Sequence, residues 1–261
     1  MQGGVHLLSG LVLASLSKRK EFKLGAVFGA ILPDFDIIIT AFAYLAIGER
    51  AGDYHRNFTH SLLFAAIVSL IIISLSFIPF IKNKTDYDFL GLGLGIGLGY
   101  LIHLFLDMLY LGKILLLWPY DKPIGFPIIP NEAFNPSIPL DALKLKLIQT
   151  TDFYTDIFLF YIPVLFLAFK MDLHKKIRIP FLIYIIVDFL IITFFIIYAF
   201  NVGISYEDHV VYLYIPGTFF LLISIISPFL FRDVIQEFKF EPWILIIILA
   251  LFVFSQFLFF I

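Results

Sequence analysis

Residues 89–111, FLGLGLGIGLGYLIHLFLDMLYL, form one uninterrupted apolar run. About 20 such residues suffice for a helix to cross the hydrocarbon core of a bilayer. The whole chain is similar in character, because 61% of its 261 residues are hydrophobic and only 15% are charged. The run nevertheless contains His103 and Asp107, and ionisable side chains inside a membrane helix are costly and commonly functional. The sequence therefore predicts a multi-pass membrane protein with chemistry inside the bilayer.

Other apolar runs separated by short charged loops predict an all-α transmembrane bundle of about eight membrane helices. The first run is too short to span the membrane, and Pro33-Asp34-Phe35-Asp36 interrupts the second. Irregular backbone and charge at membrane depth are tolerated only where they line an enclosed or wet cavity. The predicted helices cover residues 4–16, 24–47, 60–81, 89–111, 152–170, 179–200, 211–231 and 242–261.

A proline-rich segment divides this predicted bundle, since proline interrupts helices. We expect a four-helix half at residues 1–118, which carries most of the unusual polar groups, and a second four-helix half at residues 152–261. The connecting segment covers residues 119–151. One set of alternate loops holds twice as many Lys and Arg residues as the other and should face the cytoplasm. The segment His55–His60 is then expected on the extracytoplasmic side.

Composition also limits the chemistry. The formal charge of -2 provides no basic excess for binding nucleic acid. The chain has no cysteine, which excludes a thiol nucleophile or a thiolate zinc site. Any metal must be bound by His, Asp, Glu or backbone oxygen atoms.

Glycines alternate at the start of the 89–111 run. Gly91, Gly95 and Gly99 share one helical face, and Gly93 and Gly97 lie almost opposite them. Small residues allow membrane helices to approach closely. We therefore expect close helix contacts on both sides of this helix.

Ionisable residues at matched depths indicate a metal site. His103 and Asp107 are four residues apart and share a helical face, so that they can offer a nitrogen and an oxygen to one ion. His6 and Asp34 lie at equal sequence distances from a turn at Lys20, which places them at matched heights if both segments are helical.

The same reasoning places His60 opposite His103 across a turn beside Lys82. Several carboxylates and imidazoles buried together would repel one another without a cation. One or two divalent ions would remove this repulsion; zinc suits the mixed nitrogen and oxygen ligands best, and manganese is the alternative. The candidate metal ligands are His6, Asp34, Asp36, His55, His60, His103 and Asp107.

Each of these groups also has an ordinary structural explanation. A single buried histidine can be a packing residue, which is the simpler interpretation of His6 or His55 taken alone. Arg56 could bind a phosphate through its planar guanidinium group, or it could pair with Asp53 or with lipid headgroups.

Short motifs in a fixed order give the first half a family resemblance. They are an N-terminal His6, Leu32-Pro33-Asp34-Phe35-Asp36, the segment His55–Ser61 and the segment Gly99–Asp107. With these motifs, residues 1–120 resemble the inner-membrane metal-dependent hydrolases, which include LexA-regulated bacterial members. The ligand order is also similar to that of zinc-dependent phospholipase C, although this sequence has no second helical His-x-x-x-Glu. The resemblance implies a metal-dependent hydrolase.

These features together predict an enzyme that cleaves a phosphoester inside the membrane. The bound ions would lower the pKa of a water molecule for the attack. Asp36 would accept the proton, and Arg56 would contact the phosphate. Because the site is deep, we expect membrane lipids as partners and an amphiphilic substrate such as a phospholipid or a polyprenyl phosphate.

A transporter that binds a metal or a coupling ion is the alternative. It would need a polar path to both faces of the membrane. Beyond the first half, Asp188 is the main intramembrane carboxylate, which favours a functional role by default. Asp156 lies near a predicted helix end, where solvation or capping explains it.

Overall fold

The computed structural model confirms the all-α class. The described residues form no strand, and a single isolated bridge pairs Ile114 with Ile124. The structure describes residues 3–47, 56–82, 84–110, 114–126, 154–202, 222–237, 239 and 241–258.

Within the described residues, the bounds of the helices follow the predicted runs closely, whereas residues 211–221 of the seventh run and 259–261 of the eighth lie outside the described residues. Residues 222–230 are helical in addition to the labelled elements. The labelled elements are α1 (Gly3–Ser15), α2 (Lys20–Ile31), η1 (Leu32–Phe35), α3 (Asp36–Ile47), η3 (Phe58–His60), α4 (Leu62–Ser74), η4 (Leu75–Phe77), α5 (Pro79–Lys82), α6 (Phe89–Tyr110), the π-helix η6 (Asp156–Tyr161), α8 (Ile162–Lys170), α9 (Lys175–Val202), α11 (Arg232–Glu237) and α12 (Pro242–Leu258).

Two of the described helices are long and apolar enough to cross a membrane, at Phe89–Leu109 in α6 and at Lys175–Phe194 in α9. The apolar stretches in α1, α4 with η4, and α12 are shorter. The eight-span expectation is therefore not confirmed, whereas the short first helix is observed. The outer face of α9 is apolar, as contact with lipid requires. Its exposed side chains include Ile179, Ile183, Ile186, Leu190 and Phe194.

The predicted break in the second apolar run is present. α2 ends at Ile31, the 3-10 helix η1 contains Pro33 and Asp34, and α3 begins at Asp36. Proline has no backbone N–H and disfavours the α conformation in the residue before it. The break leaves both carboxylates inside the bundle, where Asp34 is 3% exposed and Asp36 is 1% exposed.

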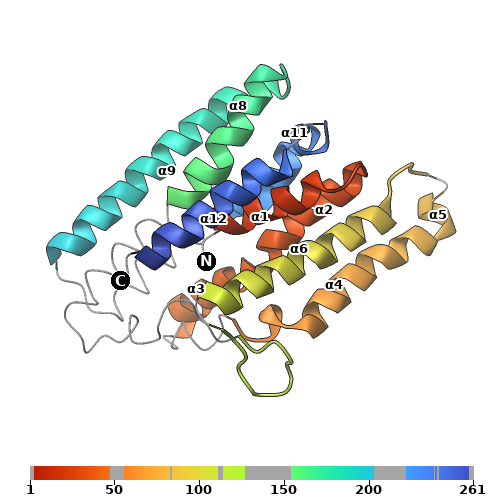
Figure 1. Cartoon of the computed structure of the whole chain (residues 1–261), viewed down its shortest axis with the longest axis horizontal. Coiled ribbons are helices and arrows are strands. Elements are labelled where there is room, and N and C mark those ends of the chain that lie inside the picture. Colours follow the sequence, from red (N-terminus) through yellow and green to blue (C-terminus); the bar gives the residue numbers. More distant parts are fainter. Residues whose placement is uncertain are drawn as a thin grey trace.

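Glycines bring α6 close to its two neighbours. α2 lies between α1 and α6, and α4 packs on the other side of α6 (Figure 1). A Cβ atom at Gly99 would lie 2.2 Å from the carbonyl oxygen of Ala26, and Gly29 of α2 is equally close to the backbone of α6. A Cβ atom at Gly97 would lie 2.8 Å from the hydroxyl oxygen of Ser69 in α4. The expected close contacts occur on both faces of α6.

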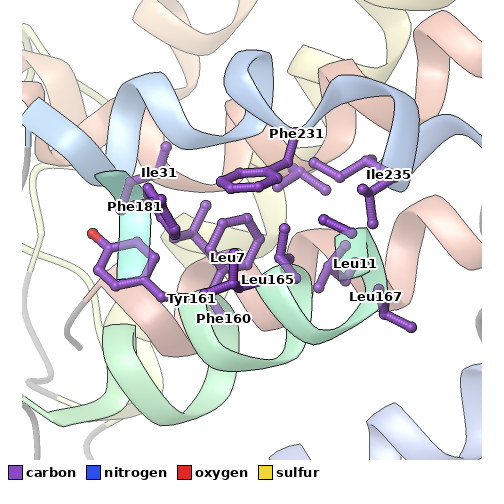
Figure 2. Packing of buried hydrophobic residues seen from close by; sticks show 14 of the residues in the cluster. Leu7, Leu11, Ile31, Phe160, Tyr161, Leu165, Leu167, Phe181, Phe231 and Ile235 are labelled. Atoms are coloured by element: carbon purple, nitrogen blue, oxygen red, sulfur yellow. The ribbon is translucent and has the colours of Figure 1, made fainter. Parts of the chain in front are cut away.

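A hydrophobic core joins α1 to the C-terminal helices. Figure 2 shows Leu7 and Leu11 of α1 beside Phe160, at the end of η6, and Phe231, just before α11. All four side chains are buried. The helix that carries His6 is therefore held by residues from both predicted halves of the chain.

Part of the predicted connecting segment lies within the described residues. Residues 114–126 form a turn closed by the Ile114–Ile124 bridge, with a cis peptide bond between Trp118 and Pro119. The proline-rich remainder at residues 127–151 lies outside the described residues, and the proposed domain boundaries stay predictions.

Candidate metal centre

Four buried side chains converge where α6 passes η1 and η3. They are Asp34, His60, His103 and Asp107, here called the His/Asp cluster, and none is more than 3% exposed. Each offers one ligand atom, and these atoms all lie within 4.8 Å of one another. His60 Nε2 is 3.3 Å from His103 Nε2, and each nitrogen is 3.6 Å from Asp34 Oδ1. Two nitrogen and two oxygen donors suit a divalent cation, and the cluster could hold one.

Local structure explains this convergence. The four-residue spacing in α6 places His103 and Asp107 on one face, with His103 Nε2 3.8 Å from Asp107 Oδ2. The α4–α6 hairpin brings His60 opposite His103, as equal distances from the turn predicted. The break after α2 adds Asp34 to the same space.

The second ring nitrogen of two histidines is engaged by neighbouring groups. His103 Nδ1 lies 2.7 Å from the carbonyl oxygen of Ala30, so this nitrogen donates and Nε2 is left to face the cluster. His60 Nδ1 lies 3.2 Å from Asp36 Oδ2 and 3.1 Å from the hydroxyl oxygen of Thr59. Contacts of this kind fix the orientation of metal-binding imidazoles.

Asp36 lies behind His60 and outside the His/Asp cluster. Its Oδ2 accepts hydrogen bonds from the Thr59 hydroxyl at 2.6 Å and from the backbone N–H of Arg56 at 2.8 Å. Arg56 has a φ of 64°, which is uncommon for a residue with a side chain. The position of Asp36 suits a carboxylate that orients His60 and its loop.

Asp107 also contacts two candidate site residues outside the His/Asp cluster, His6 and Arg56. Its Oδ1 is 3.3 Å from His6 Nε2, and its Oδ2 is 3.3 Å from Arg56 Nε and 3.4 Å from His60 Nε2. The ring of His6 also stacks on that of His103, with centroids 3.6 Å apart. Of the interpretations offered for Arg56, the structure therefore shows an ion pair, but with Asp107.

Three carboxylates, Asp34, Asp36 and Asp107, are buried within this small region. Arg56 contributes a permanent positive charge at its edge. Buried carboxylates are strongly destabilising unless they are paired or bind a cation. A divalent ion would therefore suit the charge of the region as well as its donor atoms.

One residue that contacts the site was missed by the sequence analysis. The buried Tyr100 donates its hydroxyl hydrogen to the carbonyl oxygen of Thr59 and so ties α6 to the loop before His60. The sequence could have indicated this contact, because Tyr100 lies three residues before His103 and therefore on the same side of the helix. His55 lies outside the described residues, so its role stays a prediction.

Residues 1–202 match the family described as YdjM inner membrane protein. No curated protein and no solved structure matches the chain. The family match supports the membrane part of the resemblance noted above; hydrolase activity and similarity to phospholipase C stay predictions. Since the match covers residues 1–202 of 261, including the whole candidate metal centre, the chain belongs to the YdjM inner membrane protein family and is a membrane protein.

Proposed function

We propose that this membrane protein is a metal-dependent hydrolase that cleaves a phosphoester. One observation carries the proposal: two imidazoles and two carboxylates, all buried, offer ligand atoms within 4.8 Å of one another inside an apolar bundle. Such a donor set is typical of catalytic sites that bind zinc or manganese. His6 and the second oxygen of Asp107 would complete this site or contribute to a second one.

A bound divalent cation would supply Lewis acidity at a phosphoryl oxygen and make a neighbouring water molecule more acidic. The chain's own residues would prepare for this chemistry. Ala30 holds His103, and Asp36 holds His60, so neither imidazole must reorient to bind the ion. Asp36 is not among the four convergent ligands and is the candidate proton acceptor.

Arg56 would bind the substrate phosphate. Its side chain is 23% exposed, whereas the Asp107 side chain that it contacts is 1% exposed. The guanidinium group can therefore reach a ligand at the edge of the site while it remains next to the buried carboxylate. Its planar shape suits two phosphate oxygens at once.

The surroundings favour an amphiphilic substrate, such as a phospholipid or a polyprenyl phosphate. Phe58 follows the Arg56 loop, and its ring centroid lies 6.2 Å from that of Trp118. Both side chains are 39% exposed. Exposed aromatic rings beside a cationic group suit a substrate with an apolar chain and a phosphate head.

Metal analysis of the purified protein, combined with a screen of phosphoester and lipid phosphate hydrolysis, tests this function. We expect one or two divalent ions per chain. Hydrolysis should be lost after chelation and restored by zinc or manganese. Protein that binds neither ion would overturn the proposal.

The site should face the extracytoplasmic side, because the loops at that end are poor in Lys and Arg. The chain has no cysteine, so single cysteines can be placed without interference. An Asn57→Cys variant should react with an impermeant thiol reagent from outside the cell, and a Lys84→Cys variant in the loop before α6 should not. The reverse pattern would overturn the orientation and leave the metal chemistry untouched.

A transporter remains the second candidate because of Asp188. This residue lies in the membrane-capable part of α9 and is 1% exposed, and no hydrogen bond to its Oδ1 occurs within the described part of the chain. A carboxylate of this kind can bind a coupling ion or a proton. Metal uptake by vesicles that is lost in Asp188→Asn, without any hydrolysis by the wild type, would favour this candidate.

A further inference from the structure

The first turn of α1 lies directly against the beginning of η6, although about 150 residues separate the two segments in sequence. A Cβ atom at Gly4 would be 2.2 Å from the carbonyl carbon and oxygen of Thr155. A Cβ atom at Gly3 would be 3.1 and 3.2 Å from the two carboxylate oxygens of Asp156. Only glycine allows the two backbones to approach so closely.

Asp156 links the two sides of this contact. Its carboxylate lies against the first turn of α1, next to Gly3, and follows Thr155, which contacts Gly4. Its Oδ2 also accepts from the hydroxyl of Ser224 at 2.6 Å, and the Tyr161 hydroxyl lies 2.5 Å from the same Ser224 oxygen. We call Asp156, Ser224 and Tyr161 the Asp156 network. Of the two sequence interpretations of Asp156, the structure excludes solvation of its Oδ1, which is shielded from solvent and has no hydrogen-bond partner among the described residues.

His6 lies only two residues after Gly4, and its orientation needs an explanation. His60 and His103 each have a ring nitrogen held by a neighbouring group. The Nδ1 atom of His6 is buried and has no hydrogen-bond partner among the described residues. The position of this imidazole must therefore come mainly from the backbone of α1 and from stacking on His103.

We propose that Asp156 is a positioning residue for His6, an inference that rests on the proposed metal-dependent function. The first N–H groups of a helix have no partner within that helix. A carboxylate at this end satisfies a donor and also interacts favourably with the helix dipole. Through Gly4, Asp156 sets the height and rotation of α1, and so holds His6 Nε2 beside Asp107. The second half of the chain thereby supports a metal site built by the first.

Two variants of Asp156 separate capping from direct metal binding. Asp156→Ala removes the acceptor and should weaken zinc binding by the purified, chelator-stripped protein by about tenfold, as loss of an orienting partner commonly does. Asp156→Asn keeps an acceptor oxygen, and Asn caps helices about as well as Asp, so it should restore binding to near the wild-type level. Failure of Asn to rescue would overturn the proposal, since it would indicate a need for the charge itself.

A double-mutant cycle tests whether Asp156 acts through His6. His6→Ala alone should weaken zinc binding. Asp156→Ala added to His6→Ala should cause no further loss, because the imidazole to be positioned is already absent. A further tenfold loss would overturn the proposal. Thr193→Val, which removes a hydroxyl that contacts Tyr154, is the matched control from the same half of the chain and should leave zinc affinity unchanged.

Hydrogen–deuterium exchange of the metal-free protein makes the test independent of metal binding. Asp156→Ala should accelerate exchange in the first turn of α1, whereas Asp156→Asn should not. Unchanged exchange in Asp156→Ala would overturn the positioning role, whatever the zinc affinity. If the wild-type protein binds neither zinc nor manganese, the proposed function fails, and the exchange result still decides whether Asp156 holds α1.

Discussion

The two halves of the chain both bury carboxylates among apolar helices, but the partners of these carboxylates differ between the halves. In the His/Asp cluster, carboxylates face imidazole nitrogens that come from separate elements and point to one space. In the Asp156 network, one carboxylate oxygen accepts a hydrogen bond from a serine hydroxyl, and the carboxylate lies against the first turn of a helix. The first arrangement leaves a set of convergent lone pairs, whereas the second has a single carboxylate beside hydroxyl groups.

This difference shows that a buried charge is not by itself evidence for a metal site. Asp188 and Asp107 are both buried acids in membrane-capable helices. Only Asp107 has a histidine one helical turn away and two further histidines within 3.4 Å. The convergence of nitrogen and oxygen donors distinguishes the two positions.

The largest expected effect comes from removing the negative charge at each of these two positions in turn. Asp107→Asn should abolish zinc binding and hydrolysis, because the amide keeps the shape but loses the negative charge that pairs with a cation. Asp188→Asn should retain both. Metal content and hydrolysis of the two purified variants provide the measurement. A silent Asp107→Asn combined with an inactive Asp188→Asn would move the chemistry to the second half and favour transport.

The next effect concerns the close packing beneath the cluster. Gly99→Ala would place a methyl group 2.2 Å from the Ala26 carbonyl oxygen, so α2 and α6 must separate. Overpacking of this kind costs about 1–3 kcal/mol, and here it would also separate Asp34 from His103. The thermal unfolding temperature and the zinc affinity should both decrease.

Gly97→Ala is the control for this change, because its nearest contact is the Ser69 side chain, which can rotate. We expect only a small change in unfolding temperature for this variant. Equal losses in both variants would show that the contact between α2 and α6 has no special role in holding the site.

A smaller effect should follow from removing one orienting hydroxyl. Thr59→Val deletes the hydrogen bond to Asp36 and the contact with His60, which should reduce zinc affinity by about tenfold. Thr193→Val removes a comparable hydroxyl that contacts Tyr154 in the second half, and it should leave zinc affinity unchanged. Isothermal titration of both variants decides whether the support around His60 is specific.

The smallest effect is expected from removing an exposed ion pair between the two halves of the chain. Lys20 pairs with Glu237, which raises the pKa of the lysine ammonium group above its ordinary value. Because the folded-state pKa is raised, the pairing is fully present below the unfolded pKa and is lost only as the pH rises through the folded pKa. Glu237→Gln should therefore change neither zinc affinity nor unfolding temperature measurably at neutral pH, since exposed ion pairs contribute little. A clear loss of zinc affinity would mean that the packing of α11 on α2 determines the geometry of the metal site.

Much of the candidate site could be predicted from local spacing. The break at Pro33, the shared face of His103 and Asp107, and the pairing of His60 with His103 all follow from helix periodicity and hairpin geometry. These features depend on residues that are close in sequence or related by one turn. The number of membrane-crossing helices could not be predicted in this way, because an apolar run can form a helix too short to span a bilayer.

The amino-acid pattern alone shows that this protein is helical and apolar, and that its first half places histidines and aspartates at similar depths. The contacts that these side chains make depend on the tertiary structure. It placed Asp36 behind His60, made Asp107 the contact for Arg56, and brought Asp156 to the first turn of α1. No periodicity relates residue 4 to residue 156. Their contact depends on the packing of whole helices, where side-chain volumes and backbone approach are decided together.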